Sequence, residues 1–326
     1  MKRRERDGEM GGLVDKEVPP VAPSPHLRFF LGYLGIAIIL VSEVLLFSGN
    51  QFVGGWFTPI VWTGYILFVD ALVFKVKGRS LLVNDRVELL VIVTISIACW
   101  WLFEFYNAPR FWRSNLELWW HYHNLTSNPF MRRVGYDWAF ATIFPALFET
   151  AELFQAIIFA RRGPAVSIRL SKPVLYSLIV FGAAGALLPL VVISGWFAPL
   201  VWLSFIFLLD PINHLRGQPS IAGDLAEGRW TRLLSLLAGG AVCGLLWEFW
   251  NYWALSKWTY TVPYFGNVKL FEMPLPGYLG FPPFAVECWA MYVFLRSFLA
   301  SRERDPLPQR SGIWFSSGDV KALRNS

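Results

Sequence analysis

An octapeptide occurs twice in this chain, first as Gly55-Trp56-Phe57-Thr58-Pro59-Ile60-Val61-Trp62 and again, 140 residues later, as Gly195-Trp196-Phe197-Ala198-Pro199-Leu200-Val201-Trp202. Each copy opens an apolar stretch that ends at an acid, Asp70 and Asp210. Other motifs recur in the same order: Glu104-Phe105-Tyr106-Asn107 with Glu248-Phe249-Trp250-Asn251, Trp120-His121-Tyr122 with Trp258-Thr259-Tyr260, and Pro145 to Glu149 with Pro283 to Glu287. This order indicates an internal duplication, and it picks out the polar residues that occur in both halves.

The apolar residues of the chain are gathered into long runs. The 326 residues are 55% hydrophobic and only 16% charged, and runs of this kind are typical of membrane-spanning segments. Backbone polar groups inside lipid must be satisfied within the segment, so we expect helices. The eight predicted spans cover roughly residues 29–48, 56–74, 87–106, 138–159, 173–194, 196–213, 231–253 and 278–299. The predicted fold class is therefore all-α, a polytopic membrane helix bundle.

The duplication divides these spans evenly. Four spans per half give the two halves the same orientation, as parallel repeats related by an axis near the membrane normal. We therefore expect a disordered, Pro-rich cytoplasmic tail over 1–28, a first membrane repeat over 29–160, a second over 173–300 and a cytoplasmic tail over 301–326.

Charge predicts the orientation. Lys and Arg are concentrated in the tails and in the loops at 75–86, 160–172 and 214–232, which would all lie on one side. The positive-inside rule places that side, with both termini, in the cytoplasm, as in a bacterial inner-membrane protein. The 107–137 loop, which carries four arginines, is the exception. The net charge of +6 follows from this bias, so we expect no nucleic-acid partner. The three cysteines fall inside spans and predict no disulfide framework.

Several acids fall within or at the ends of the predicted spans. Ionisable groups at bilayer depth cost about 2.5–3.5 kcal/mol each and usually mark a functional site. Glu43 and Glu152 have no counterpart in the other half, so we interpret them as packing groups. Asp70 and Asp210 are duplicated near cytoplasmic span ends, where a functional and a structural role are equally consistent with the pattern.

The remaining duplicated acids are candidate catalytic residues. The i, i+3 spacing places Glu104 with Asn107, and likewise Glu248 with Asn251, on one helix face. Glu149 and Glu287 each follow a proline by four residues, and we expect both near the middle of the membrane. A carboxyl in apolar surroundings can stay protonated and act as an acid. The alternative is a buried Glu–Asn hydrogen bond that only joins helices.

Seventeen tryptophans make the chain Trp-rich. Many should anchor the spans at the membrane interface, but others cluster in sequence beside the acids. Indole faces stabilise cations, so an aromatic pocket with a neutral acid suits protonation of a carbon–carbon double bond, a polyene or a quaternary amine. The candidate substrate-binding residues are Asn107, Asn251, Trp120, Tyr122, Trp258 and Tyr260. His121 and His123 could contribute to a metal site, but Thr259 replaces the first in the second half. We predict neither metal nor cofactor.

In both halves a Trp-x-Tyr segment precedes a proline that is followed closely by a glutamate at the start of an apolar span; in the second half the stretch between them, from Gly277, is rich in Gly and Pro and leads to Glu287. This order of motifs resembles the duplicated membrane domains of the bacterial and fungal type of lycopene cyclase. In this chain the proline is two residues further from the Glu, and Thr150 and Cys288 stand where that family has a second Glu. The resemblance implies cofactor-independent, acid-catalysed cyclisation of a carotenoid end group within the bilayer.

Three functions fit the sequence. The first is an intramembrane enzyme that acts by carboxylic-acid catalysis on an isoprenoid, carotenoid or other lipid, so that the partner is a membrane lipid or apolar small molecule. The second is a proton-coupled transporter, because parallel repeats with buried acids suit that task. The third is a non-catalytic membrane scaffold. The sequence leaves open the substrate, the oligomeric state and whether both repeats are active.

Overall fold

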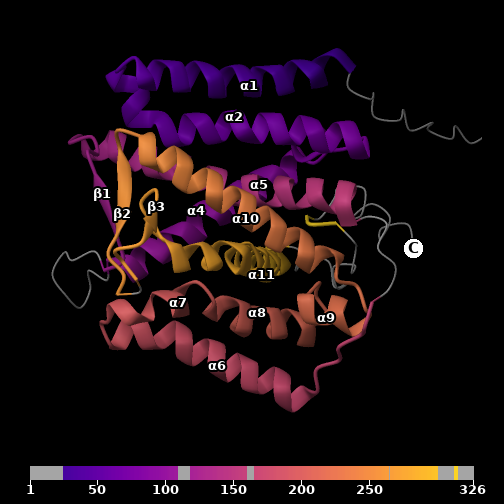
Figure 1. The fold of residues 1–326 in the computed structure, drawn as a ribbon. Coiled ribbons are helices and arrows are strands. Elements are labelled where there is room, and N and C mark those ends of the chain that lie inside the picture. The colour runs from indigo at the N-terminus through magenta and orange to yellow at the C-terminus, as the bar shows by residue number, and fades with distance from the viewer. Residues whose placement is uncertain (1–24, 109–117, 160–164, 264, 300–311, 315–326) are drawn as a thin grey trace, which may run out of the picture.

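Figure 1 shows the computed structural model of the chain, which describes residues 25–108, 118–159, 165–263, 265–299 and 312–314. Within these residues, eight helices are long and apolar enough to cross a membrane, which confirms the predicted helical membrane protein. The predicted tails lie outside the described residues, except for 25–28 and 312–314.

Six membrane-crossing helices are continuous or nearly so: α1 (Pro25–Phe47), α2 (Gln51–Lys77), α4 (Arg86–Asn107), α5 (Pro129–Phe154), α6 (Lys172–Val191) and α10 (Thr231–Trp253). A π-helical turn, η1 (Gln155–Phe159), extends α5. The other two crossings are composite: η2 (Gly195–Phe197) with α7 (Ala198–Val201) and α8 (Ser204–Leu215), and η3 (Leu275–Gly280) with α11 (Phe281–Leu299). Two short helices, α3 (Leu81–Asn84) and α9 (Ile221–Ala226), lie in loops.

Helix α5 begins well before residue 138, where we expected its span to start. The Asn128 side chain caps the helix by accepting from the amides of Phe130 and Met131, and Pro129 suits the first helical position. At 1.5 Å per residue, Glu149 therefore lies about 30 Å from the start of the helix. This places Glu149 toward the far end of α5, about twenty residues from the start of the helix, whereas we expected its span to begin about eleven residues before it.

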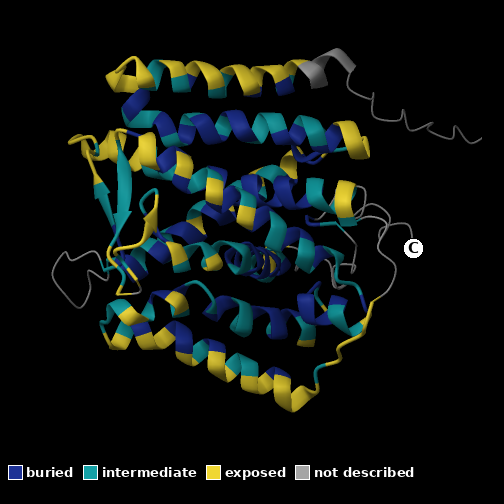
Figure 2. Ribbon diagram, viewed as in Figure 1, coloured by how far each residue is buried: buried dark blue, intermediate teal, exposed yellow. Residues whose placement is uncertain are grey.

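The helices form layers, with α1 and α6 on the two outer faces and α4, α5, α10 and α11 between them (Figure 1). Helices α1 and α6 carry many of the exposed residues in Figure 2, whereas the central helices are largely buried. The exposed side chains of the outer helices include Tyr33, Val44, Val180 and Val191. Because these side chains are apolar, the two outer faces suit contact with lipid tails.

Small residues allow each outer helix to approach its neighbour closely. A Cβ atom added at Gly35 of α1 would lie 2.5 Å from the carbonyl oxygen of Gly64 in α2. In the second half, a Cβ atom at Gly182 of α6 would lie 2.4 Å from the amide nitrogen of Leu208 in α8. Close backbone approach at small residues is the usual way that helices associate where no hydrophobic effect drives them together.

The octapeptide and its copy adopt different structures. The first copy lies within the continuous helix α2, whereas the second forms η2 and α7 and is followed by a break at Leu203, before α8. At this break the backbone amide of Phe205 donates to the Glu287 carboxylate at 3.0 Å. The carboxylate thus satisfies a backbone donor that an unbroken helix would satisfy itself.

The two ends of the bundle have different connections. At one end, β1 (Trp120–His123) pairs antiparallel with β2 (Lys257–Tyr260), so that Trp120 faces Tyr260 and Tyr122 faces Trp258. A smaller pair, β3 (Lys269–Leu270) and β4 (Met273–Pro274), lies beside it. We call this the strand end. The opposite end carries α9 (Figure 1) and α3, which follows the last residue of α2, and is called the α3/α9 end.

Candidate functional site

Two asparagines fix the paired strands to the helix ends. In the first half, the Asn107 side chain accepts from the amide of Trp119 at 2.9 Å and donates to the carbonyl of Trp120 at 2.8 Å. In the second half, Asn251 accepts from the amide of Trp258 at 2.9 Å and donates to the carbonyl of the same residue at 2.8 Å. Both asparagines are fully buried. They were predicted to bind substrate, and the structure shows them holding the backbone of the Trp-x-Tyr segments.

Glu104 lies behind the first Trp-x-Tyr segment and accepts hydrogen bonds from neutral aromatic donors. One oxygen accepts from the Tyr122 hydroxyl at 2.5 Å, from Trp100 Nε1 at 3.0 Å and from Trp120 Nε1 at 3.2 Å. These three neutral donors stabilise the Glu104 carboxylate. The sequence had indicated that these motifs belong together, and the structure brings them into direct contact.

Glu248 holds the corresponding position behind the second segment. Its Oε1 accepts from the Tyr260 hydroxyl at 2.8 Å, and that hydroxyl accepts from Trp258 Nε1 at 2.7 Å. Glu248 is fully buried, and its Oε2 has no hydrogen-bond partner among the residues that the structure describes. A buried polar atom without a partner is uncommon and marks a place where a ligand or water can bind.

The two tyrosines stay protonated over a wide pH range. Burial raises the pKa of the Tyr122 hydroxyl well above its ordinary value, and the charge of Glu104 raises it further. Burial also raises the pKa of the Tyr260 hydroxyl well above its ordinary value, and the charge of Glu248 raises it further. Each tyrosine therefore remains a hydrogen-bond donor between its glutamate and the space in front of it.

That space is an apolar cavity of about 660 Å³, here called the aromatic chamber. Its wall contains residues of both halves, among them Trp62, Trp100, Trp120, Tyr122, Trp202, Trp247, Trp258, Tyr260 and Phe284. Trp100 and Trp247 stack with ring centroids 5.3 Å apart, and Trp202 meets Phe284 at 5.0 Å. The wall also includes the exposed side chains of Phe52 and Leu279, so the chamber extends from the buried core to the surface near the strand end.

Two of the four predicted catalytic acids lie away from this chamber. Glu149 accepts from the amide of Leu81 at 3.2 Å, beside α3, and Glu287 accepts from Phe205 at the helix break. Neither lines the chamber, and the Oε2 atom of each has no hydrogen-bond partner within the described part of the chain. Glu149 and Glu287 occupy the same motif in the sequence but lie in different surroundings. Glu149 belongs to the continuous helix α5, whereas the helix of Glu287, α11, is preceded by the short helix η3.

The other duplicated acids serve the loop helices. Asp70 accepts from Ser80 Oγ at 2.8 Å and from the amide of Leu82 at 2.9 Å. Asp210 accepts from the amides of Ile221 at 2.6 Å and Ala222 at 2.9 Å. Because these amides begin α3 and α9, each aspartate binds a helix N-terminus. The structural role that the sequence left open accounts for both.

The histidines of the first strand contact hydroxyls across the ribbon. His121 Nε2 lies 2.5 Å from Thr261 Oγ1, and His123 Nε2 lies 2.8 Å from Thr259 Oγ1. Among the described residues, no cluster of three or more His, Cys, Asp or Glu side chains could hold a metal ion. Glu43, interpreted as a packing group, accepts from Trp250 Nε1 at 3.1 Å.

The sequence did not reveal every residue of the site. Trp62 and Trp202, the last residues of the two octapeptides, line the chamber although their motif precedes the acids by many residues. Their duplication was the available signal. Ser80 and Ser220 also recur at the octapeptide's spacing of 140 residues, directly before α3 and α9.

Comparison of the chain with protein-family models, curated proteins and solved structures gave no match.

Proposed function

We propose that the chain is an intramembrane enzyme that takes an elongated apolar molecule of the isoprenoid class into the aromatic chamber and transfers a proton to or from it. The observation that carries the proposal is the chamber itself: an apolar, aromatic cavity backed by two carboxyl groups, the half-buried Glu104 and the buried Glu248, each behind a tyrosine hydroxyl. Ligand sites are typically concave, largely apolar and supplied with a few convergent polar groups.

In this proposal Tyr122 and Tyr260 relay protons between the chamber and the carboxyls of Glu104 and Glu248. A hydroxyl can accept one proton while it gives up another, so the glutamate need not touch the substrate. Protonation of a carbon–carbon double bond leaves a carbocation, which the surrounding indole faces stabilise through their quadrupoles. The apolar wall offers few polar groups to bind water that would otherwise capture the cation.

The resemblance to lycopene cyclase domains supports this reaction class through the Trp-x-Tyr segments, which line the chamber. The carboxyls assigned by the resemblance are Glu149 and Glu287, whereas the chamber's geometry favours Glu104 and Glu248. Acid catalysis by Glu149 and Glu287 remains the sequence-based prediction, and the experiment below compares the two pairs directly.

We also propose that the two halves are parallel repeats in a bacterial inner membrane, with the α3/α9 end in the cytoplasm. The antiparallel pairing of the equivalent segments β1 and β2 supports this. A two-fold axis through the centre of the two strands would place Trp120 opposite Tyr260 and Tyr122 opposite Trp258, as observed. The equivalent Asn and Glu contacts in each half, and the basic residues Lys75, Lys77 and Arg79 beside α3, agree with it.

The test is a comparison of total lipids from cells that express the wild type, Glu104→Gln/Glu248→Gln or Glu149→Gln/Glu287→Gln, by mass spectrometry at matched protein levels. We expect an isoprenoid product with the wild type and the second double variant, and its loss with the first. Loss only with Glu149→Gln/Glu287→Gln would instead favour the acids that the resemblance assigns. Identical profiles for all three proteins would contradict the enzyme.

A second candidate function is a proton-coupled carrier, and the break between α7 and α8 favours it. Discontinuous helices with a half-helix N-terminus near the middle of the membrane are typical of transporter sites, and here the Phe205 amide at that N-terminus binds Glu287. Proton flux into proteoliposomes that is lost in Glu287→Gln, with unchanged cellular lipids, would establish the carrier in place of the enzyme.

A further inference from the structure

A short C-terminal segment is buried at the α3/α9 end, far along the chain from the helices that enclose it. Gly312, Ile313 and Trp314, here called the C-terminal tripeptide, are described by the structure, and Ile313 and Trp314 are only 2% and 6% exposed. Twelve residues, 300–311, connect the tripeptide to the end of α11.

The main chain of the tripeptide is bound by side chains of both halves. The amide of Ile313 donates to Glu152 Oε2 of α5 at 2.8 Å, and its carbonyl accepts from Trp289 Nε1 of α11 at 2.8 Å. The carbonyl of Gly312 accepts from Arg232 Nε of α10 at 3.3 Å. An extended peptide needs a hydrogen-bond acceptor for each amide and a donor for each carbonyl. Here a carboxylate is the acceptor, and a guanidinium and an indole are the donors.

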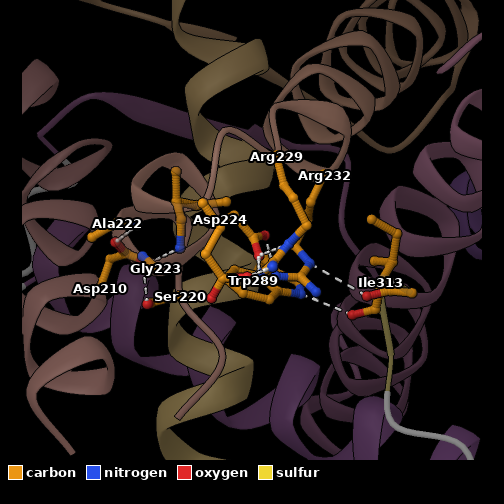
Figure 3. A network of polar contacts seen from close by, with 12 residues as sticks. Asp210, Ser220, Ala222, Gly223, Asp224, Arg229, Arg232, Trp289 and Ile313 are labelled. Atoms are coloured by element: carbon orange, nitrogen blue, oxygen red, sulfur yellow. Dashed lines mark hydrogen bonds and ion pairs between the residues drawn. The ribbon is translucent and has the colours of Figure 1, made fainter. Parts of the chain in front are cut away.

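The side chains that bind the tripeptide are themselves held in place. Figure 3 shows Arg232 beside Asp224 and Trp289, with Ile313 next to them. Arg232 forms an ion pair with Asp224 and lies over the Trp289 ring at 4.7 Å. Glu152 forms an ion pair with Lys77. The site is therefore organised by contacts that do not involve the tripeptide.

Trp314 completes the arrangement on the side of the first half. Its Nε1 donates to Asp85 Oδ2 at 3.3 Å, and Asp85 also pairs with Arg79 at 3.1 Å. Asp85, Glu152 and Arg232 are all buried. Buried charges in a membrane protein are costly, and they usually pair with one another and mark a functional site.

We propose that this cleft, formed by Asp85, Glu152, Arg232 and Trp289, is a peptide-binding site whose ligand is the chain's own C-terminal tripeptide, bound reversibly. The tripeptide closes the α3/α9 end between the two halves, and its release exposes the charged cleft to water. The site selects an extended peptide with a bulky apolar residue followed by an indole. This inference concerns the end of the bundle opposite the aromatic chamber and does not depend on the proposed enzyme.

The polar contacts allow the tripeptide to leave. The hydrogen bonds to the tripeptide come from four side chains, and water can solvate these side chains after release.

The experiment measures the reaction of Gly312→Cys with a membrane-impermeant maleimide in the full-length protein in detergent; this variant keeps Ile313 and Trp314, and its Cβ atom meets no neighbour closer than 3.5 Å. The native cysteines Cys99, Cys243 and Cys288 are buried, so the wild type gives the background. We expect labelling at least about tenfold slower in the folded protein than after unfolding in SDS, because reaction requires opening. A synthetic peptide of residues 308–318 should accelerate labelling by keeping the released segment out, whereas the same peptide with Asp in place of Ile should not.

Trp289→Phe supplies a matched perturbation, because it removes the indole donor to Ile313 and keeps an aromatic ring. We expect it to accelerate labelling about fivefold, the effect of one lost hydrogen bond. The control is Trp253→Phe, at a 45% exposed position of α10, which should leave the rate unchanged. Labelling of the folded protein as fast as in SDS would overturn the burial, and slow labelling that neither the peptide nor Trp289→Phe changes would overturn a reversible site.

Discussion

At the scale of single residues, duplicated polar side chains divide into two groups with different tasks. Asn107, Asn251, Asp70 and Asp210 bind backbone groups that begin or fix a local element. The glutamates behind the tyrosines instead accept hydrogen bonds from side chains that line a cavity. The sequence identifies both groups because each recurs at a nearly constant spacing. It could not separate them, because the partner of each side chain depends on packing between distant segments.

The asparagines give the first prediction. Asn107→Ala removes a side chain that satisfies several buried backbone groups of 118–120, and should lower the free energy of unfolding by about 3 kcal/mol. Asn251→Ala, with two such bonds, should lower it by about 2 kcal/mol. SDS titration in mixed micelles, followed by tryptophan fluorescence, measures both. Stability equal to the wild type in either variant would show that the strand is held by other contacts.

The tyrosines give a prediction about pH. Since burial and the adjacent glutamates raise the pKa of Tyr122 and Tyr260 in the folded protein, the folded state holds these protons more tightly than the unfolded state. Above about pH 10, the ordinary tyrosine pKa, ionisation favours the unfolded state, so stability should fall as the pH rises further. Unfolding midpoints between pH 8 and pH 11 should decline less steeply in Tyr122→Phe/Tyr260→Phe, and parallel curves for both proteins would contradict the raised pKa values.

At the scale of elements, the apolar runs were sufficient to predict eight helices, because a membrane-spanning helix must satisfy its own backbone and be apolar over about 20 residues. The start of α5 was not predicted because its first turns are polar: Arg133 and Asp137 form an ion pair at 2.8 Å, and Asp137 also accepts from Trp101 Nε1. The break before α8 was not predicted because both octapeptides contain the same proline. A tertiary contact with Glu287 distinguishes the two copies.

The helix crossings provide an element-scale prediction. Gly35→Ala places a Cβ atom 2.5 Å from the carbonyl of Gly64, so α1 and α2 must separate, with an expected loss of about 2 kcal/mol. Gly280→Ala is the matched control, because a Cβ atom there has no neighbour within 4 Å. The same SDS titration compares them. Equal stability of the two variants would mean that α1 does not depend on the close crossing.

At the scale of the whole molecule, the two ends of the bundle are closed in different ways. The strand end places the aromatic chamber between the halves, and the opposite end carries the charged cleft that binds the C-terminal tripeptide. The duplication made the contribution of both halves to the chamber foreseeable. The cleft was not foreseeable, because Glu152, Arg232 and Trp289 have no equivalents in the other half and the tripeptide lies outside both repeats.

The central claim is that the chamber binds an apolar molecule, and the most direct measurement is mass spectrometry of small molecules that co-purify with the wild type and with Gly280→Leu. Gly280 lines the chamber and a Cβ atom there meets no neighbour within 4 Å, so leucine adds apolar bulk at the chamber wall without a clash at its Cβ atom. Ala184→Leu, on the exposed face of α6, controls for added bulk. We predict an isoprenoid-like molecule bound to the wild type and to Ala184→Leu, and its loss from Gly280→Leu. The same molecule retained equally by all three folded proteins, or no apolar molecule in any of them, would contradict the account.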